Sequence, residues 1–186
     1  MDKDLLARID DRADAVLDRF RGRPALDGAA AVLSNLADYG VVWVVLAGGQ
    51  GRRRGPARQR ASRALALSGV LSYGVNKAVK AVVQRERPEA VLEVGTVPVR
   101  TPSSSSFPSG HTLAAFSTAV MLPTTPAGTA ACLTFATAVA TSRVYLRHHH
   151  ASDVVAGAAI GGALGLAGRL LLNRLPGMGR RGRRLK

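Results

Sequence analysis

The fold class follows first from the stretch "ASDVVAGAAIGGALGLAGRLLL", residues 151–172 of a 186-residue chain. Its length is close to the roughly 20 residues that a helix needs to cross a membrane. Gly157, Gly161 and Gly165 recur at every fourth position, so they line one helix face that another helix can approach closely. The pattern predicts a transmembrane helix packed on a neighbour in the same chain, with a homodimer contact through this glycine face as the alternative.

Four more apolar segments precede this one, and they are rich in Ala and Gly rather than Leu. The sequence therefore predicts an all-α fold, an integral membrane helical bundle with about five transmembrane helices. A soluble bundle is the alternative, because the mean hydropathy is only +0.09, but that average includes strongly charged ends. The four segments lie at about residues 29–49, 62–84, 110–123 and 128–146.

Residues 2–20 are predicted to form an amphipathic helix, because apolar residues such as Leu5, Ile9 and Val16 recur at helical spacing. Such a helix lies on a membrane surface or packs as an ordinary surface helix. We expect three parts: an amphipathic interfacial helix at 1–24, a transmembrane core at 25–175 and a basic tail at 176–186.

The distribution of arginine predicts the orientation. The net charge is +14, and basic residues concentrate in the loop 50–63 and in the tail from Arg169 onward. Loops rich in Lys and Arg stay in the cytoplasm, and five spans place these two regions on the same side. We expect a multi-pass protein of the cell membrane with a cytoplasmic C-terminus. The loop 85–109 and residues 142–153 then face the extracytoplasmic side.

Composition argues against several classes of function. Aromatic residues make up only 4% of the chain, which leaves few stacking platforms for nucleic acid. Cys132 is the single cysteine, so an internal disulfide and a cysteine-based zinc site are excluded. Seven of the twelve acidic residues fall within residues 1–27, which leaves too few carboxylates for a two-metal site. We expect neither a metal nor another cofactor.

Three polar stretches carry the candidate chemistry: "KAVVQRERP" at 80–88, "PSGH" at 108–111 and "SRVYLRHHHASD" at 142–153. Each begins or ends a predicted helix, and the predicted topology gathers all three at one membrane face. Together they supply cations, backbone amides, histidines and one carboxylate. These are the groups that cleavage of a phosphate ester requires.

Phosphoryl oxygens need neutralising donors. Lys80, Arg87 and Arg143 supply positive charge, and each arginine can bind with a two-pronged fork. Ser109 and Gly110 open a predicted helix, whose free N–H groups attract an anion. Donors fixed in this way stabilise a charged transition state.

Histidine is the available residue for both the nucleophile and the acid. A nucleophilic histidine needs one neutral ring nitrogen, with the other proton held by a partner. Asp153 can be that partner for His149 at i−4 or for His150 at i−3, and the spacing does not choose between them. His148 is at i−5 and points elsewhere.

The three stretches resemble the type 2 phosphatidic acid phosphatase family, whose site pattern is shared with vanadium haloperoxidases. The family pattern is Lys-x6-Arg-Pro, then Pro-Ser-Gly-His, then Ser-Arg-x5-His-x3-Asp. The matching residues are Lys80, Arg87, Pro88, Pro108, Ser109, Gly110, His111, Ser142, Arg143, His149 and Asp153. One departure is the span count, because many membrane members of the family have six spans.

The resemblance implies a role for each of these positions. His149 would attack phosphorus and form a phosphohistidine, and Asp153 would orient it. His111 would protonate the leaving oxygen and then activate water. The phosphate would be held by Lys80, Arg87, Ser109, Gly110 and Arg143. The residues left without a role are Asp38, Lys77, Arg85, His148 and His150. Lys77 and Arg85 are expected to be solvated charges. The serines at 103–106 are expected to form a flexible polar loop.

The function that follows is a metal-independent membrane lipid phosphatase. It would hydrolyse a phosphomonoester or diphosphate of a lipid: a polyprenyl diphosphate or phosphate derivative, phosphatidic acid or phosphatidylglycerol phosphate. A lipid phosphotransferase with the same site and a prenyl phosphosugar phosphatase are the alternatives. A binding protein with a relic site is disfavoured, because His149, His111 and Arg143 are all present.

Overall fold

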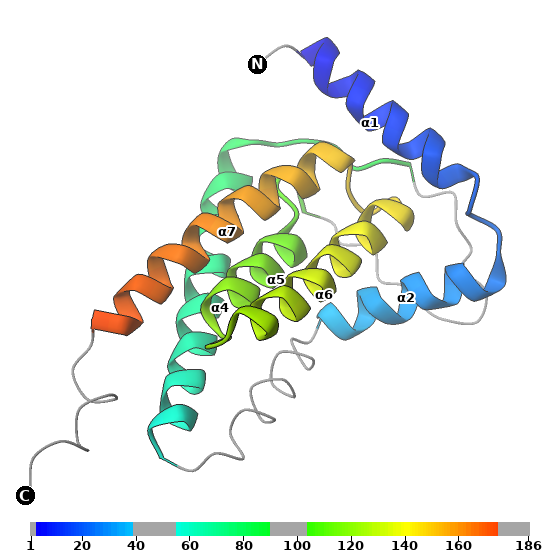
Figure 1. The fold of residues 1–186 in the computed structure, drawn as a ribbon. Coiled ribbons are helices and arrows are strands. Elements are labelled where there is room, and N and C mark those ends of the chain that lie inside the picture. The colour runs from blue at the N-terminus through cyan, green and yellow to red at the C-terminus, as the bar shows by residue number, and fades with distance from the viewer. Residues whose placement is uncertain (1–2, 39–54, 90–103, 175–186) are drawn as a thin grey trace, which may run out of the picture.

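The structure is a computed structural model that describes residues 3–38, 55–89 and 104–174. Within these ranges every regular element is a helix, so the predicted all-α fold class is confirmed (Figure 1). The helices are α1 (Lys3–Asp18), α2 (Pro24–Asp38), α4 (Pro56–Val82), α5 (Gly110–Met121), α6 (Pro126–Tyr145) and α7 (Ala151–Arg174).

The helices coincide with the predicted apolar segments, although residues 39–49 of the first segment lie outside the described residues. In the described part of the chain, α7 is the one helix long and apolar enough to cross a membrane. Helix α5 has only 12 residues, and α4 carries arginines in its first turns and Asn76, Lys77 and Lys80 near its other end. The count of about five transmembrane helices therefore stays a prediction.

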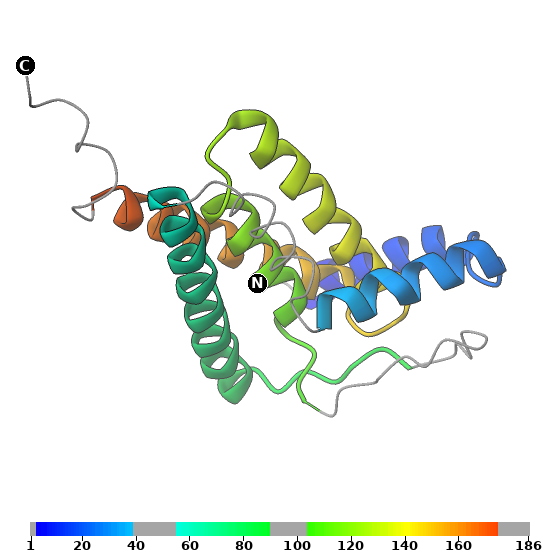
Figure 2. The ribbon, with the colours of Figure 1, turned by 90° about the horizontal axis from the view of Figure 1, so that it is seen from below.

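Helix α5 is at the centre of the bundle and packs against α4, α6 and α7 (Figures 1 and 2). It is apolar on several sides because it has neighbours on several sides: Leu113, Ala115 and Ala119 are all buried. The first residue of this short helix belongs to the "PSGH" stretch. The packing of α5 therefore sets where that part of the candidate site lies.

The glycine face of α7 packs against α5. A Cβ added at Gly157 would lie 2.8 Å from the backbone oxygen of Ser109, and one added at Gly165 would lie 2.7 Å from that of Ser117. Gly161 is in still closer contact with the backbone of Leu113. Because α5 of the same chain fills this face, the expectation of a homodimer contact through Gly157, Gly161 and Gly165 is corrected.

Helix α1 lies across the ends of α6 and α7 (Figure 1). Arg21, just after α1, donates to the backbone oxygens of Tyr145 and Val144 at 2.8 and 2.9 Å and so caps the last carbonyls of α6. The apolar side of α1 faces outward instead: Leu5 and Val16 are about half exposed. This orientation fits a helix at a membrane surface, and the assignment of residues 1–24 as an interfacial unit stays a prediction.

We expect Gly161→Ala to destabilise the protein by about 1–3 kcal/mol, because its methyl group meets the α5 backbone. The matched control is Gly162→Ala, where an added Cβ meets nothing within 4 Å. Since alanine favours helix, that variant should be neutral or more stable by up to about 1 kcal/mol. Thermal unfolding in detergent, followed by circular dichroism, measures both. Equal melting temperatures would contradict the packing of α5 on α7.

Candidate active site

The ends of four helices meet at one end of the bundle, and the three polar stretches meet there with them. The N–H of Ser106 donates to the backbone oxygen of Arg85 at 2.9 Å. The N–H of Ser109 donates to the backbone oxygen of Asp153 at 3.1 Å. These bonds join the segment after α4, the segment before α5 and the start of α7.

A tight turn after α6 places the histidines. Arg147 has a φ of 54°, the left-handed conformation that commonly ends a helix, and its N–H bonds the oxygen of Val144 at 3.0 Å. The chain then folds back, and the N–H groups of His148 and His149 donate to the oxygen of Arg143 at 3.0 and 3.2 Å. The sequence "SRVYLRHHH" therefore forms a compact corner rather than a longer helix.

His149 is buried, and each of its two ring nitrogens has a neighbour. Its side chain is 2% exposed, its Nδ1 lies 2.7 Å from the backbone oxygen of Ser106, and Asp153 Oδ2 is 3.7 Å from the same nitrogen. A carbonyl oxygen only accepts, so Nδ1 carries the proton and Nε2 carries the lone pair. Nε2 faces Arg87, with Nη1 at 3.4 Å.

Burial keeps this imidazole neutral. Loss of solvation lowers the pKa of His149 to about 4, and the positive charges of Arg87 and Arg143 add to that effect. The carboxylate of Asp153 acts in the opposite direction but does not outweigh the burial. The neutral form, which has a nucleophilic lone pair, therefore predominates at neutral pH.

Asp153 contacts both neighbouring histidines. Its Oδ2 accepts from the backbone N–H of His150 at 2.9 Å and lies 3.3 Å from the Nδ1 of that ring, closer than to the ring of His149. The two histidines differ in their surroundings: the His150 side chain is 26% exposed, whereas His149 is buried with Arg87 at its second nitrogen. His149 therefore has the more suitable surroundings for phosphate chemistry.

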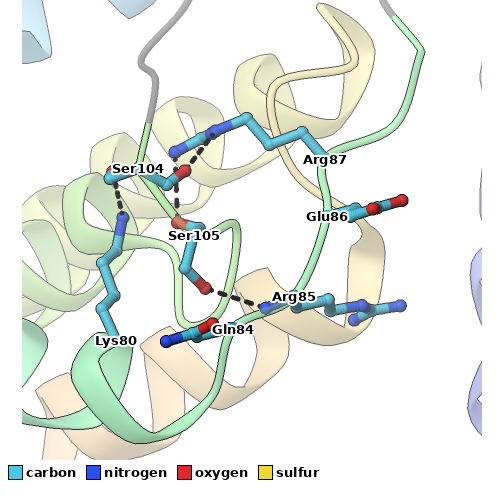
Figure 3. Close-up of a pocket in the computed structure, with 7 residues that line it drawn as sticks. All are labelled: Lys80, Gln84, Arg85, Glu86, Arg87, Ser104 and Ser105. Carbon is cyan, nitrogen blue, oxygen red and sulfur yellow. Dashed lines mark hydrogen bonds between the residues drawn. The ribbon is translucent and has the colours of Figure 1, made fainter.

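Lys80 and Arg87 converge on Ser104 (Figure 3). Lys80 Nζ donates to the Ser104 hydroxyl at 3.1 Å, and Arg87 Nε donates to the Ser104 backbone oxygen at 2.9 Å. Arg87 also donates to the backbone oxygens of His148 at 2.5 Å and of Ser105 at 3.3 Å. The two cations stand in a cleft of about 660 Å³, lined by Lys80, Gln84, Arg85, Glu86, Arg87, Ser104 and Ser105 (Figure 3).

The remaining predicted residues lie at adjoining helix ends. Arg143, in the last turn of α6, is 1% exposed and donates to the hydroxyl of Ser34 in α2. Ser109 is buried directly before α5, and Gly110 and His111 are the first two residues of that helix. Both His111 and Gly110 are partly exposed.

The serines before "PSGH" are structural partners of the site, which corrects the expectation of a flexible loop for residues 104–106. The hydroxyl of Ser105 donates to the oxygen of Val83 at 2.6 Å, and that of Ser106 to the oxygen of Glu86 at 2.8 Å. Short hydroxyl side chains readily bond to backbone groups in this way. A run of serines beside one of the three motifs is the signal in the sequence that could have indicated this role. Ser103 lies outside the described residues.

Arg85 is not a solvated charge, contrary to expectation. Its side chain is 28% exposed and points away from the meeting point of Lys80 and Arg87 (Figure 3). It donates to Asp153 Oδ1, to the Ser152 hydroxyl and to Asp10 Oδ2, each at 2.7 Å. Asp10 was not anticipated as part of the site, since it resembles the other charged residues of α1.

Two cations beside a buried neutral histidine are suited to binding and cleaving a phosphate ester. Comparison with known protein families points to the same chemistry. The PAP2 superfamily model matches residues 61–175, and the chain belongs to this superfamily. This confirms the family predicted from the three motifs. It also confirms the predicted enzyme class, a lipid phosphatase.

The similar proteins are phosphatases. Decaprenylphosphoryl-5-phosphoribose phosphatase of Mycolicibacterium smegmatis is 34% identical over 146 residues, 77% of each chain. The Mycobacterium tuberculosis protein of the same name is 28% identical, over 81% of this chain and 83% of its own length.

Two solved structures share the fold. LpxE of Aquifex aeolicus has a TM-score of 0.65 and 25% identity, over 83% of this chain and 91% of its own. A transmembrane PAP2 type phosphatidylglycerolphosphate phosphatase of Bacillus subtilis has a TM-score of 0.64 and 23% identity, over 88% and 83%.

We expect His149 to titrate near pH 4 in the folded protein, against about 6.5 in the unfolded chain. Because the folded pKa is the lower one, the stability that this group contributes is complete above about pH 6.5 and is lost as the pH falls toward about 4. NMR of protein labelled at histidine ¹³Cε1, with His149→Gln to assign the signal, measures the titration. A midpoint near 6.5 would show that the ring is not buried as described.

Proposed function

We propose that this protein removes the terminal phosphate from a polyprenylphosphoryl sugar phosphate, as a prenyl phosphosugar phosphatase. The substrate class is supported by the relative named decaprenylphosphoryl-5-phosphoribose phosphatase, which matches 77% of both chains. The observation that carries the chemistry is the contact of His149 Nε2 with Arg87 at 3.4 Å, because Arg87 also lines the cleft that contains Lys80. Phosphatidic acid, phosphatidylglycerol phosphate and polyprenyl diphosphate are the competing substrates.

In the first step, the lone pair of His149 Nε2 forms a bond to phosphorus while the bond from phosphorus to the sugar oxygen breaks. His111 gives its proton to the departing oxygen, which leaves as a neutral hydroxyl group. Lys80, Arg87 and Arg143, with the amides at Ser109 and Gly110, hold the phosphoryl oxygens, whose charge rises in the transition state. Asp153 and the Ser106 carbonyl keep the Nδ1 proton in place.

In the second step, water attacks the phosphohistidine. His111, now unprotonated, takes a proton from the water, and the bond between Nε2 and phosphorus breaks to release inorganic phosphate. The ring of His149 carries positive charge while it is phosphorylated and protonated at Nδ1. A carboxylate at 3.7 Å stabilises that charge.

We propose that the cleft faces the extracytoplasmic side, with the C-terminus in the cytoplasm. The basic loop and tail adjoin Pro56 and Arg174, and these helix ends lie together at the end of the bundle away from the cleft (Figure 1). There Arg60 and Arg169 donate to the oxygens of Leu122 and Val120 at the end of α5. Cations at this end fit the positive-inside rule.

We expect phosphate release by detergent-purified protein to persist in EDTA and to be fastest, among the substrates of the panel, on prenylphosphoryl-5-phosphoribose. His149→Ala should lower kcat by about 10³-fold or more, because the nucleophile is lost. His150→Ala is the matched control and should retain activity within about tenfold. Acid-labile ³²P on the protein, present in His150→Ala and absent from His149→Ala, identifies the phosphohistidine.

Loss of activity in His150→Ala but not in His149→Ala would reverse the assignment of the nucleophile. Loss in EDTA, with recovery on adding a divalent ion, would replace the metal-free mechanism. A faster reaction with phosphatidic acid or phosphatidylglycerol phosphate would change the substrate and leave the histidine chemistry intact.

Orientation is tested by labelling single cysteines in a Cys132→Ala background. Glu89→Cys, in the exposed segment after α4, should react with an impermeant maleimide on intact cells. Arg58→Cys, at the exposed start of α4, should react only after permeabilisation. The opposite pattern would mean that the cleft faces the cytoplasm.

A further inference from the structure

A chain of charges runs from α1 to the catalytic end of α7. Arg85 stands between two carboxylates: its Nη2 donates to Asp10 Oδ2 and its Nη1 to Asp153 Oδ1, both at 2.7 Å. Nη1 also donates to the Ser152 hydroxyl at 2.7 Å. One guanidinium therefore joins the first helix of the chain to the residue beside His149.

Asp10 is built into this end of the fold and is only 7% exposed. Its Oδ1 accepts from the backbone N–H of Ser152 at 2.7 Å, and its Oδ2 accepts from the Ser152 hydroxyl at 2.8 Å. Ser152 is the second residue of α7, and the first four amides of a helix have no acceptor within it. Asp10 thus caps α7 from another helix, one residue before Asp153.

Arg85 also determines how Asp153 is turned. Because Oδ1 is occupied by the guanidinium, Oδ2 is left for the N–H of His150 at 2.9 Å and for the ring of His149 at 3.7 Å. Asp153 is completely buried, so a change in its partners is not compensated by water.

The charges explain why two carboxylates are needed. An Arg85 paired with Asp153 alone would neutralise the carboxylate that faces His149. Asp10 shares the positive charge and leaves the group of three with a net charge of −1. That negative charge stabilises the His149 ring when it becomes positive in the phosphohistidine.

We propose that Asp10 and Arg85 are positioning residues that act through Asp153 on His149, which makes α1 part of the catalytic unit. The inference rests on the proposed function, because it needs His149 as the nucleophile. Asp10 does not line the cleft, and Arg85 lines it but directs its guanidinium away from Lys80 and Arg87, to Asp10 and Asp153. Their loss should therefore lower kcat, whereas KM should change little.

The test measures kcat and KM for Asp10→Asn on the substrate that the panel ranks first. Asparagine keeps the shape and an acceptor for Ser152 but removes the charge that Arg85 shares. We expect kcat to fall by roughly 10- to 100-fold, the usual effect of losing an outer partner of a catalytic group, with KM within about threefold. Asp10→Asn in an Arg85→Gln background should add almost nothing, because the chain of contacts is already broken.

The matched control is Asp14→Asn, one turn along the same helix. Asp14 pairs with Arg21 at 2.6 Å and with Arg147 at 3.1 Å, so its loss loosens α1 without touching Arg85 or Asp153. This variant should melt at a lower temperature and keep its kcat. If Asp14→Asn lost as much kcat as Asp10→Asn, the role of α1 would be structural support only, and the proposal would be overturned.

Two further variants make each outcome decisive. If Asp10→Asn does not fold, Arg85→Lys keeps a charge between the carboxylates but lacks the fork, and it should show the same loss in kcat with KM preserved. Full activity in a folded Asp10→Asn, with His149→Ala inactive, would overturn this inference and leave the proposed function standing. Full activity in His149→Ala would overturn the proposed function itself.

Discussion

The buried carboxylate of Asp153 is the constraint on which the catalytic end of the molecule depends. An ionised group without exposure to water costs several kcal/mol unless its oxygens are paired. Its partners come from the segment after α4 and from the corner between α6 and α7, and Asp10 extends the pairing to α1. Satisfying one charge therefore fixes three separate segments around His149.

Close packing of α5 on α7 makes that pairing geometrically possible. The absence of side chains at Gly157 and Gly161 lets the backbones approach, and the N–H of Ser109 then reaches the oxygen of Asp153 at 3.1 Å. A bulkier residue on this face would separate Ser109 from Asp153. The same glycines thus serve both stability and the geometry of the site.

Helix α1 has an exposed apolar side and a buried aspartate, and its amphipathic pattern alone predicts only the first of these. Its apolar side is exposed, as suits a helix at the surface of a membrane, and its buried Asp10 faces the ends of α7 and the Arg85 segment. A lipid phosphate presents its headgroup at that same boundary between apolar and polar surroundings. The position of α1 therefore brings an exposed apolar surface close to the segment that holds Arg85 and Asp153.

The sequence alone determined the helices and the family, and it predicted the phosphate-binding residues, because helical periodicity and motif spacing are local properties. The spacing to Asp153 alone did not choose between His149 and His150, and His149 was predicted only through the family pattern. Burial and the contact with Arg87 distinguish them, and these arise only from tertiary packing. Likewise, Asp10 bonds a residue 142 positions away, and Ser106 bonds one 43 positions away. A charged or hydroxyl residue looks alike in sequence whether it meets solvent or a buried partner, so only the folded chain revealed these contacts.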